Sequence, residues 1–200
     1  RDRAYHACVS FVDAQIGLIL DKLKMQKLWD DTIVIFMSDH GYHLGEHFMW
    51  GKVTLFEECA RVPLVVRVPG VSPAGATSDG LVETIDLFPT LAELCGLDAP
   101  AHLQGQSYTS LIRKPDTPGR PSAYTVVSLV TQLGRSIRTK RWRYAEWGEA
   151  KAAELYNLQK DPREYTNFAK SPKHLDVVKQ MESRLVERQA QAEAARKSRK

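Results

Sequence analysis

Residues 32–41 read Thr-Ile-Val-Ile-Phe-Met-Ser-Asp-His-Gly, and this stretch decides the fold class of the 200-residue chain. Its first six residues are β-branched or apolar on both alternating faces, which is typical of a strand that helices cover. A polar turn then ends the run. Because open α/β sheets bind ligands at the carboxyl ends of their strands, the stretch predicts a buried strand that presents Asp39 and His40 to a site.

The segments on both sides of this strand extend an α/β pattern. Residues 4–28 carry apolar side chains at steps of three and four, which predicts a long amphipathic helix. Residues 62–68 form a second apolar run and predict another strand. Residues 84–97, with Pro89 in the first turn, predict a helix. This order predicts an α/β fold with a helix-covered, mainly parallel sheet.

The pattern of the sequence changes in its second half. Prolines interrupt residues 101–122, which predicts a connector. Four strand-like runs predict a small antiparallel sheet at residues 124–130, 135–139, 142–147 and 154–158. Residues 172–195 predict a closing helix. We therefore expect residues 1–100 to be part of an α/β domain and residues 123–200 to be a small subdomain with a terminal helix and a basic tail.

The composition is that of a globular protein, with 43% hydrophobic and 26% charged residues. Much of the net charge of +4 comes from residues 196–200. For this run a solvated tail is favoured over a membrane or polyanion patch, so we expect no nucleic-acid partner. No apolar run approaches the roughly 20 residues of a membrane span, and no membrane partner is expected. The start at Arg1, without a leader, suggests a cut into a longer protein.

Four short motifs follow one another after the first predicted strand. They are Ser38-Asp39-His40-Gly41, Leu44-Gly45-Glu46-His47, Trp50-Gly51-Lys52 and Arg61-Val62-Pro63-Leu64. Each motif is weak alone, but in this order and at this spacing the set resembles the sulfatase family of the alkaline phosphatase superfamily. The resemblance extends across nearly the whole chain. The later runs at residues 134–139, 142–144 and 154–158 are similar to the terminal strands of the iduronate-2-sulfatase-like branch.

The resemblance implies roles for three residues. Asp39 would bind a divalent cation, usually calcium, and His40 would be a second ligand or would touch the sulfate and the nucleophile. Lys52 would hold a sulfate oxygen and the bridging ester oxygen. These roles suit the chemistry, because a fixed cation and a fixed ammonium stabilise the negative charge that develops on the leaving alcohol.

The family's nucleophile has no counterpart in this sequence. Sulfatases attack with a formylglycine made within a Cys-x-Pro/Ala-x-Arg motif, and none of Cys8, Cys59 and Cys95 begins one. In the family that motif lies in the N-terminal half with an Asp pair of the metal site. We therefore expect the 200 residues to be inactive alone, to need a missing N-terminal half, and to act with it on a sulfated small molecule or carbohydrate. A periplasmic, secreted or lysosomal location is what the family implies.

Several residues have competing interpretations. Asp39 alone also suits a cap of the next turn, and Lys52 alone suits a solvated surface position. His40, His43 and His47 suit zinc, but the flanking glycines favour a loop and the H-E-x-x-H order is missing, so structural roles are favoured for the last two.

Other polar residues are weaker candidates. Glu57, Glu58 and Asp86 suit a glycosidase pair, although nothing in the sequence holds them across one bond, and capping or solvation is favoured. His6 and Arg61 also suit positions near the site. For both residues, packing or surface pairing is the favoured interpretation.

Residues 142–147 read Trp-Arg-Tyr-Ala-Glu-Trp and combine one cationic with three aromatic side chains. They suit a sugar sulfate pocket or nucleic-acid stacking, but a half-exposed sheet is the favoured interpretation. Two other functions also stay open. The first is a phosphodiesterase or phosphonate hydrolase of the same superfamily, and the second is a non-catalytic module that kept the fold.

Overall fold

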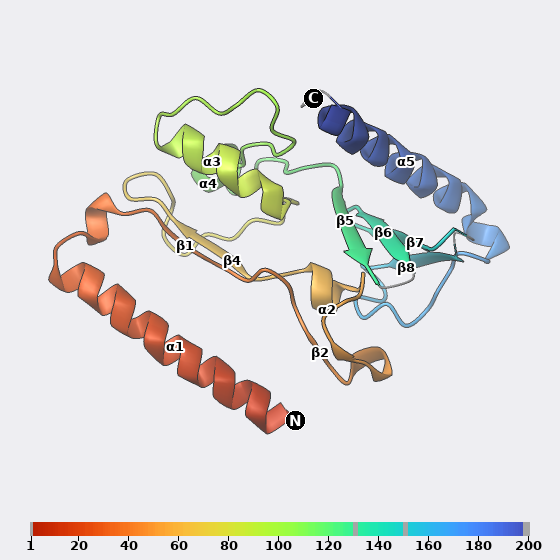
Figure 1. Cartoon of the computed structure of the whole chain (residues 1–200), viewed down its shortest axis with the longest axis horizontal. Coiled ribbons are helices and arrows are strands. Elements are labelled where there is room, and N and C mark those ends of the chain that lie inside the picture. Colours follow the sequence, from red (N-terminus) through yellow and green to blue (C-terminus); the bar gives the residue numbers. More distant parts are fainter. Residues whose placement is uncertain (1, 130–131, 150–151, 198–200) are drawn as a thin grey trace.

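The computed structural model of the chain describes residues 2–129, 132–149 and 152–197, with side chains up to residue 195. In chain order the elements are α1 (Asp2–Met25), η1 (Trp29–Asp31), β1 (Val34–Met37), β2 (His43–Leu44), η2 (Glu46–Phe48), β3 (Trp50–Gly51), α2 (Glu57–Ala60), β4 (Leu64–Arg67), η3 (Thr84–Asp86), α3 (Leu87–Leu94), α4 (Thr109–Arg113), β5 (Ala123–Ser128), β6 (Leu133–Arg138), β7 (Trp142–Trp147), β8 (Ala152–Asn157), η4 (Pro172–His174) and α5 (Leu175–Lys197). Figure 1 shows β1 and β4 on one side and β5 to β8 on the other, with a loop between them that carries α2 and β2.

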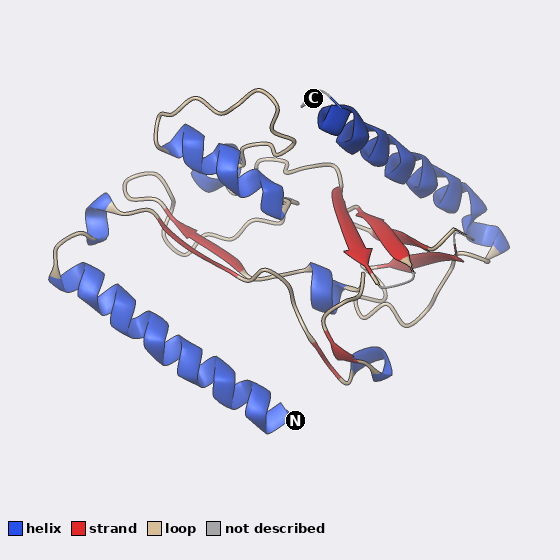
Figure 2. Ribbon diagram, viewed as in Figure 1, coloured by secondary structure: helices blue, strands red, loops and turns tan. Residues whose placement is uncertain are grey.

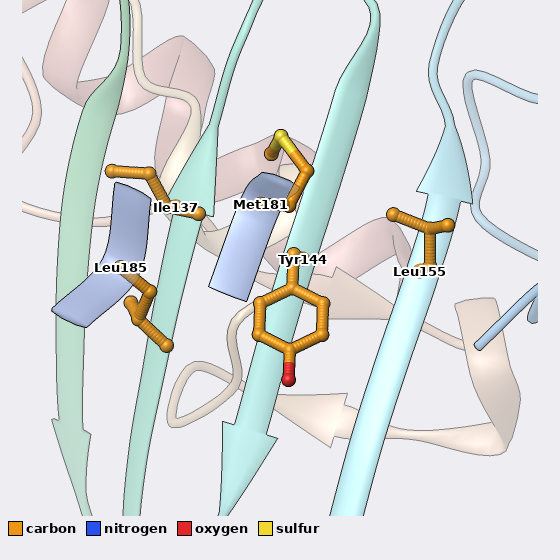
Figure 3. Close-up of a cluster of buried hydrophobic side chains, with 5 residues drawn as sticks. All are labelled: Ile137, Tyr144, Leu155, Met181 and Leu185. Carbon is orange, nitrogen blue, oxygen red and sulfur yellow. The ribbon is translucent and has the colours of Figure 1, made fainter. Parts of the chain in front are cut away.

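The four-stranded sheet is antiparallel in the order β5-β6-β7-β8, and α5 covers one of its faces. Ile137, Tyr144 and Leu155 project from three of the strands toward Met181 and Leu185 of the helix (Figure 3). These five side chains are at most 2% exposed. The predicted antiparallel sheet and closing helix are therefore confirmed, although Val130 of the predicted run 124–130 lies outside the described residues.

The other main sheet pairs β1 with β4, from Val34 opposite Arg67 to Met37 opposite Leu64. The pairing is antiparallel, so the α/β class is confirmed but the mainly parallel sheet is wrong for this pair. The physical reason is the connection, because residues 38–63 return to the same end of the sheet without a crossover that covers its face. Figure 2 shows this long excursion from the sheet and back.

A second core lies under β4. Val68 packs with Tyr108, Leu111 and Ile112, which come from α4 and the residue before it. The sequence predicted only a connector at residues 101–122, so this short helix was missed. The predicted helix at residues 84–97 is present as η3 followed by α3, and Gly96 ends it with a φ of 67°.

The helix α1 has the predicted position but contributes no buried side chain. Phe11 and Ile19 on this helix are each 67% exposed. Within the described residues, no helix is long and apolar enough to cross a membrane. All three cysteines are free thiols.

Candidate active site

Asp39, His40 and Lys52 come together just beyond the carboxyl end of β1. Nζ of Lys52 lies 2.8 Å from Nε2 of His40. Oδ2 of Asp39 lies 3.4 Å from the same nitrogen. The His40 side chain is 34% exposed and that of Asp39 is 83% exposed, so the cluster is open to a ligand. The three residues that the motifs singled out are therefore neighbours in space.

The hydrogen bonds of His40 assign its tautomer. Nδ1 lies 2.9 Å from the carbonyl oxygen of Gly41, which only accepts, so Nδ1 carries the proton. Nε2 then has a lone pair and accepts a hydrogen bond from the Lys52 ammonium. A neutral imidazole and the Asp39 carboxylate together form an electron-rich pair beside one cation.

The turn that carries Asp39 and His40 is fixed by local contacts. The backbone N–H of His40 donates to Oδ1 of Asp39 at 3.0 Å, and the Ser38 hydroxyl donates to the His40 carbonyl at 2.7 Å. Gly41 follows because a side chain does not fit, since a Cβ there would lie 1.9 Å from the carbonyl oxygen of Glu58. Asp39 thus caps locally with one oxygen and keeps the other for the site.

Lys52 follows a hairpin whose two strands are each two residues long. In it, His43 pairs with Gly51 and Leu44 pairs with Trp50. Oε2 of Glu46 accepts the Leu44 N–H at 2.7 Å and closes the hairpin. Backbone hydrogen bonds lower the pKa of this carboxyl group, so it stays ionised.

Sequence alone favours a partly enclosed site around Lys52, because Phe48, Met49, Trp50 and Phe56 lie near it. Phe48, Met49 and Trp50 are 102%, 41% and 42% exposed, Phe56 is half-buried, and Lys52 is exposed. The described residues therefore do not enclose Lys52.

His43 and His47 have structural positions, as favoured above. The His43 side chain is fully buried, and Nε2 lies 2.7 Å from the Thr54 hydroxyl. Burial lowers the pKa of His43 and keeps it neutral. The His47 ring stacks on Phe56 with centroids 3.8 Å apart. Among the described residues, no three His, Cys, Asp or Glu side chains are grouped to hold a metal ion.

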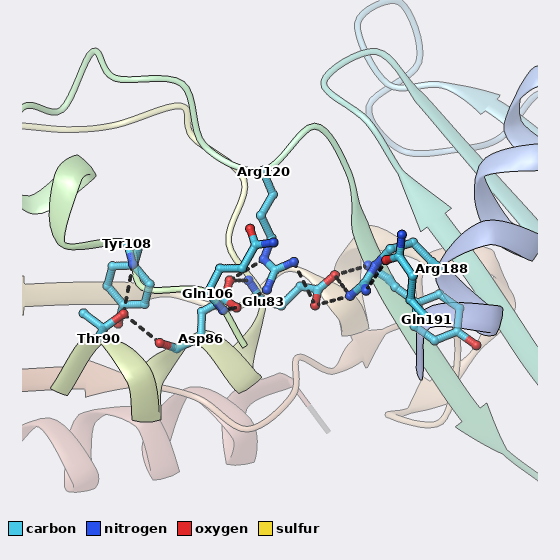
Figure 4. Close-up of polar contacts among 9 residues, drawn as sticks. Glu83, Asp86, Thr90, Gln106, Tyr108, Arg120, Arg188 and Gln191 are labelled. Atoms are coloured by element: carbon cyan, nitrogen blue, oxygen red, sulfur yellow. Dashed lines mark hydrogen bonds and ion pairs between the residues drawn. The ribbon is translucent and has the colours of Figure 1, made fainter. Parts of the chain in front are cut away.

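The carboxylates considered for glycoside chemistry form ion pairs instead. Asp86 is 1% exposed, pairs with Arg120 and accepts the Gln106 N–H at 2.8 Å. Figure 4 shows Arg120 between Asp86 and Glu83, with Arg188 of α5 on the other side of Glu83.

The remaining candidates near the site have separate surroundings. Oε2 of Glu58 lies 3.9 Å from Nε2 of His47. His6 meets Tyr5 edge-on within α1, and Arg61 is exposed after α2. No hydrogen bond or ion pair joins either His6 or Arg61 to Lys52 in the part of the chain that the structure describes.

The strand β7 is covered on both faces, so the favoured half-exposed sheet is wrong. Tyr144 faces α5, whereas Arg143 lies on the opposite face and pairs with Glu57 of α2. Arg143 also forms an ion pair with Glu164. Sequence reasoning missed this network, because its members are spread over more than 100 residues and no motif links them.

Comparison with known proteins identifies the family. The family model described as "N-sulphoglucosamine sulphohydrolase, C-terminal" matches residues 45–191, and one described as "Protein of unknown function (DUF229)" matches residues 2–68. A sulfatase of Formosa agariphila is 32% identical over 92% of this chain and 35% of its own length. Human iduronate 2-sulfatase is 30% identical over 83% of this chain and 43% of its own length.

Solved structures agree with the sequence comparison. A protein in complex with its substrate D-glucosamine-2-N,6-O-disulfate matches with a TM-score of 0.88 and 29% identity, over 93% of this chain and 40% of that one. The phosphonate monoester hydrolase of Agrobacterium radiobacter matches with a TM-score of 0.82 and 31% identity, over 92% and 40%.

This chain belongs to the sulfatase family and has its alkaline phosphatase-like fold. More narrowly, it corresponds to the C-terminal portion of a sulfatase, and iduronate 2-sulfatase is among its relatives. It spans 35% and 43% of the length of the two curated relatives named above.

Proposed function

We propose that the protein that contains this chain hydrolyses sulfate esters, and that the chain supplies Asp39, His40 and Lys52 to the active site. One observation carries the proposal, namely the 2.8 Å contact between the Lys52 ammonium and Nε2 of His40 at the end of β1. In a chain of the sulfatase family, this contact places a fixed positive charge beside the two polar side chains of the strand-end turn.

Lys52 has the clearest chemical role. Its ammonium has three donors, of which His40 accepts one, so two are left for a sulfate oxygen and the ester oxygen. When the S–O bond breaks, its electron pair moves to the ester oxygen, and a nearby ammonium stabilises that charge. The neutral His40 ring holds the ammonium in place without competing for the anion.

Asp39 and His40 would hold a divalent cation, with calcium as the proposed ion. Oδ2 of Asp39 carries free lone pairs that suit a cation, whereas Nε2 of His40, 3.4 Å away, would bind the ion only after the Lys52 ammonium gives up its hydrogen bond, because the ring nitrogen has a single lone pair. Calcium takes 6–8 oxygen ligands, so these two residues form only part of a site. When bound, the ion would supply positive charge for the sulfate group.

The isolated chain is proposed to be inactive, because no Cys-x-Pro/Ala-x-Arg segment is present to supply the nucleophile.

The division into residues 1–100, 101–122 and 123–200 is likewise proposed, with the last part packed beside the site loop. Sulfated carbohydrates are the proposed substrate class, since one of the similar solved structures is described as a complex with its substrate D-glucosamine-2-N,6-O-disulfate.

A phosphonate monoester hydrolase is the second candidate, because a protein of that description matches this fold at 31% identity. A direct test compares 4-nitrophenyl sulfate with a phenyl phosphonate monoester, using the full-length protein and the 200-residue chain. Turnover of the sulfate by the full-length protein alone is expected. A higher kcat/KM on the phosphonate would favour the second candidate, and sulfate turnover by the 200-residue chain would contradict its proposed inactivity.

A further inference from the structure

The helix α2 begins five residues after Lys52, and the C-terminal part of the chain holds its first residue from two directions. The Glu57 carboxylate pairs with Arg143 of β7 and lies 3.3 Å from Nε of Arg138 of β6. The Glu57 backbone N–H donates to Oε2 of Glu164 at 2.7 Å. Nε of Arg143 lies 2.7 Å from Oε1 of Glu164 and completes the network.

The other end of α2 holds the active-site turn. The Gly41 N–H donates to the carbonyl oxygen of Cys59 at 2.9 Å. The same glycine has no room for a Cβ, because the Glu58 carbonyl is in contact with it. Its own carbonyl accepts the Nδ1–H of His40, whose Nε2 accepts from Lys52. An unbroken series of contacts therefore runs from the C-terminal sheet to the site.

The burial of this network argues for a geometric role. The Arg143 and Glu164 side chains are 2% and 0% exposed. Removing such charges from water costs several kcal/mol per ion, so a buried pair adds little stability over apolar residues of similar volume. What the contacts of Glu57 do supply is direction, because the Arg143 guanidinium donates a hydrogen bond to its carboxylate and the Glu164 carboxylate accepts one from its backbone N–H. These two hydrogen bonds fix where α2 begins.

We infer that Arg143 and Glu164 are positioning residues, which place α2 and through it Gly41, His40 and Lys52 for sulfate binding. The inference rests on the proposed function for its catalytic consequence. Its structural part does not rest on the proposed function, because it states only that contacts with the C-terminal sheet keep residues 38–60 ordered. The two parts are therefore tested by separate measurements.

The structural measurement is hydrogen–deuterium exchange of the full-length protein, followed in peptides that cover residues 38–60. Arg143→Met keeps the volume of the side chain and removes its charge, and faster exchange of these peptides is expected. The matched control is Arg188→Met, which removes a different ion pair, to Glu83 at 2.9 Å, between α5 and the other part of the chain. In the control, exchange of residues 38–60 should stay at the wild-type rate.

The kinetic measurement separates positioning from a purely structural role. In Arg143→Met we expect kcat on the sulfate ester to fall about 10- to 100-fold with a smaller change in KM, because misplacing a reacting group by about 1 Å costs this much. Glu164→Gln keeps an acceptor for the Glu57 N–H and should lose much less than Glu164→Ala. If Arg143→Met does not fold, the two Glu164 variants make the same comparison.

The outcomes are distinct. Unchanged exchange of residues 38–60 in Arg143→Met and Glu164→Ala, with only a lower Tm, would overturn the inference. Faster exchange in a protein that turns over no sulfate ester would keep the structural part and contradict the proposed function. Equal effects of Arg188→Met and Arg143→Met on residues 38–60 would also overturn it, since the coupling would then be general.

Discussion

The β1–β4 sheet and the four-stranded sheet differ in how far the described residues bury them. The four-stranded sheet and α5 enclose Leu155 and Leu185 at 0% and 1% exposure. In the two-stranded sheet, Phe36 and Val65 are paired neighbours and are 44% and 61% exposed. The C-terminal part therefore completes its own core, whereas the β1–β4 sheet and α1 present apolar surface.

The difference shows why one polar network matters to the site. The site turn belongs to the sheet with the less complete core, but α2 beside it is tied to the sheet with the complete one. We therefore expect the order of the site turn to depend on contacts from outside its own sheet.

The largest effect on stability is expected in the C-terminal core. Leu155→Ala should lower the free energy of unfolding of this chain by about 2–5 kcal/mol, because it leaves a cavity in a fully buried cluster. Ile19→Ala in α1 should change it by under about 0.5 kcal/mol, since this side chain is 67% exposed. Denaturant unfolding measures both, and similar losses would contradict the contrast between the two parts.

A pH-dependent effect is expected where the two parts meet. Burial raises the pKa of Glu164 to about 7, with the Arg143 charge acting in the opposite direction. The folded protein then holds a proton that the unfolded chain has lost, so this contribution to stability is present below the unfolded pKa near 4.5 and is lost as the pH rises through about 7.

Glu164→Gln removes that titration. The variant should therefore gain stability relative to the wild type between pH 5 and pH 8, and chemical denaturation at several pH values measures the difference. A constant difference between Glu164→Gln and the wild type across this range would show that Glu164 does not titrate there.

The smallest effect is expected at the tip of the hairpin. Phe48 has a φ of 58° and a fully exposed side chain, a conformation that glycine adopts without steric cost. Phe48→Gly should therefore raise the free energy of unfolding by up to about 1 kcal/mol, as relief of this strain exceeds the added freedom of the unfolded chain. Phe48→Ala keeps the strain and should give no gain, so a gain of equal size in both variants would refute the explanation.

Local patterns predicted the longer elements and singled out three residues that lie together in the structure. Asp39, His40 and Lys52 stand in an ordered set of motifs, and the bounds of β7 follow from its alternating side chains. The metal, substrate and catalytic roles of these three residues remain predictions, since contact alone does not establish a role.

Long-range pairing was not predictable from the same patterns. The antiparallel pairing of β1 and β4 depends on the path of the intervening residues, and apolar runs predict strands without their direction. Arg143 was read as part of a half-exposed strand, because its partner Glu57 lies 86 residues away. The helix α4 was missed because its five residues are too few for a helical period to be visible.

The contact of Lys52 with His40 is tested most directly by steady-state kinetics of the full-length protein on a sulfate ester. Lys52→Ala should lower kcat/KM about 100-fold or more with an unchanged Tm, because it removes the fixed charge beside the leaving oxygen. Lys140→Ala, an exposed lysine between β6 and β7, should leave kcat/KM within about twofold of the wild type. Unaltered kinetics in a folded Lys52→Ala variant would remove Lys52 from the active site and contradict the proposed function of this cluster.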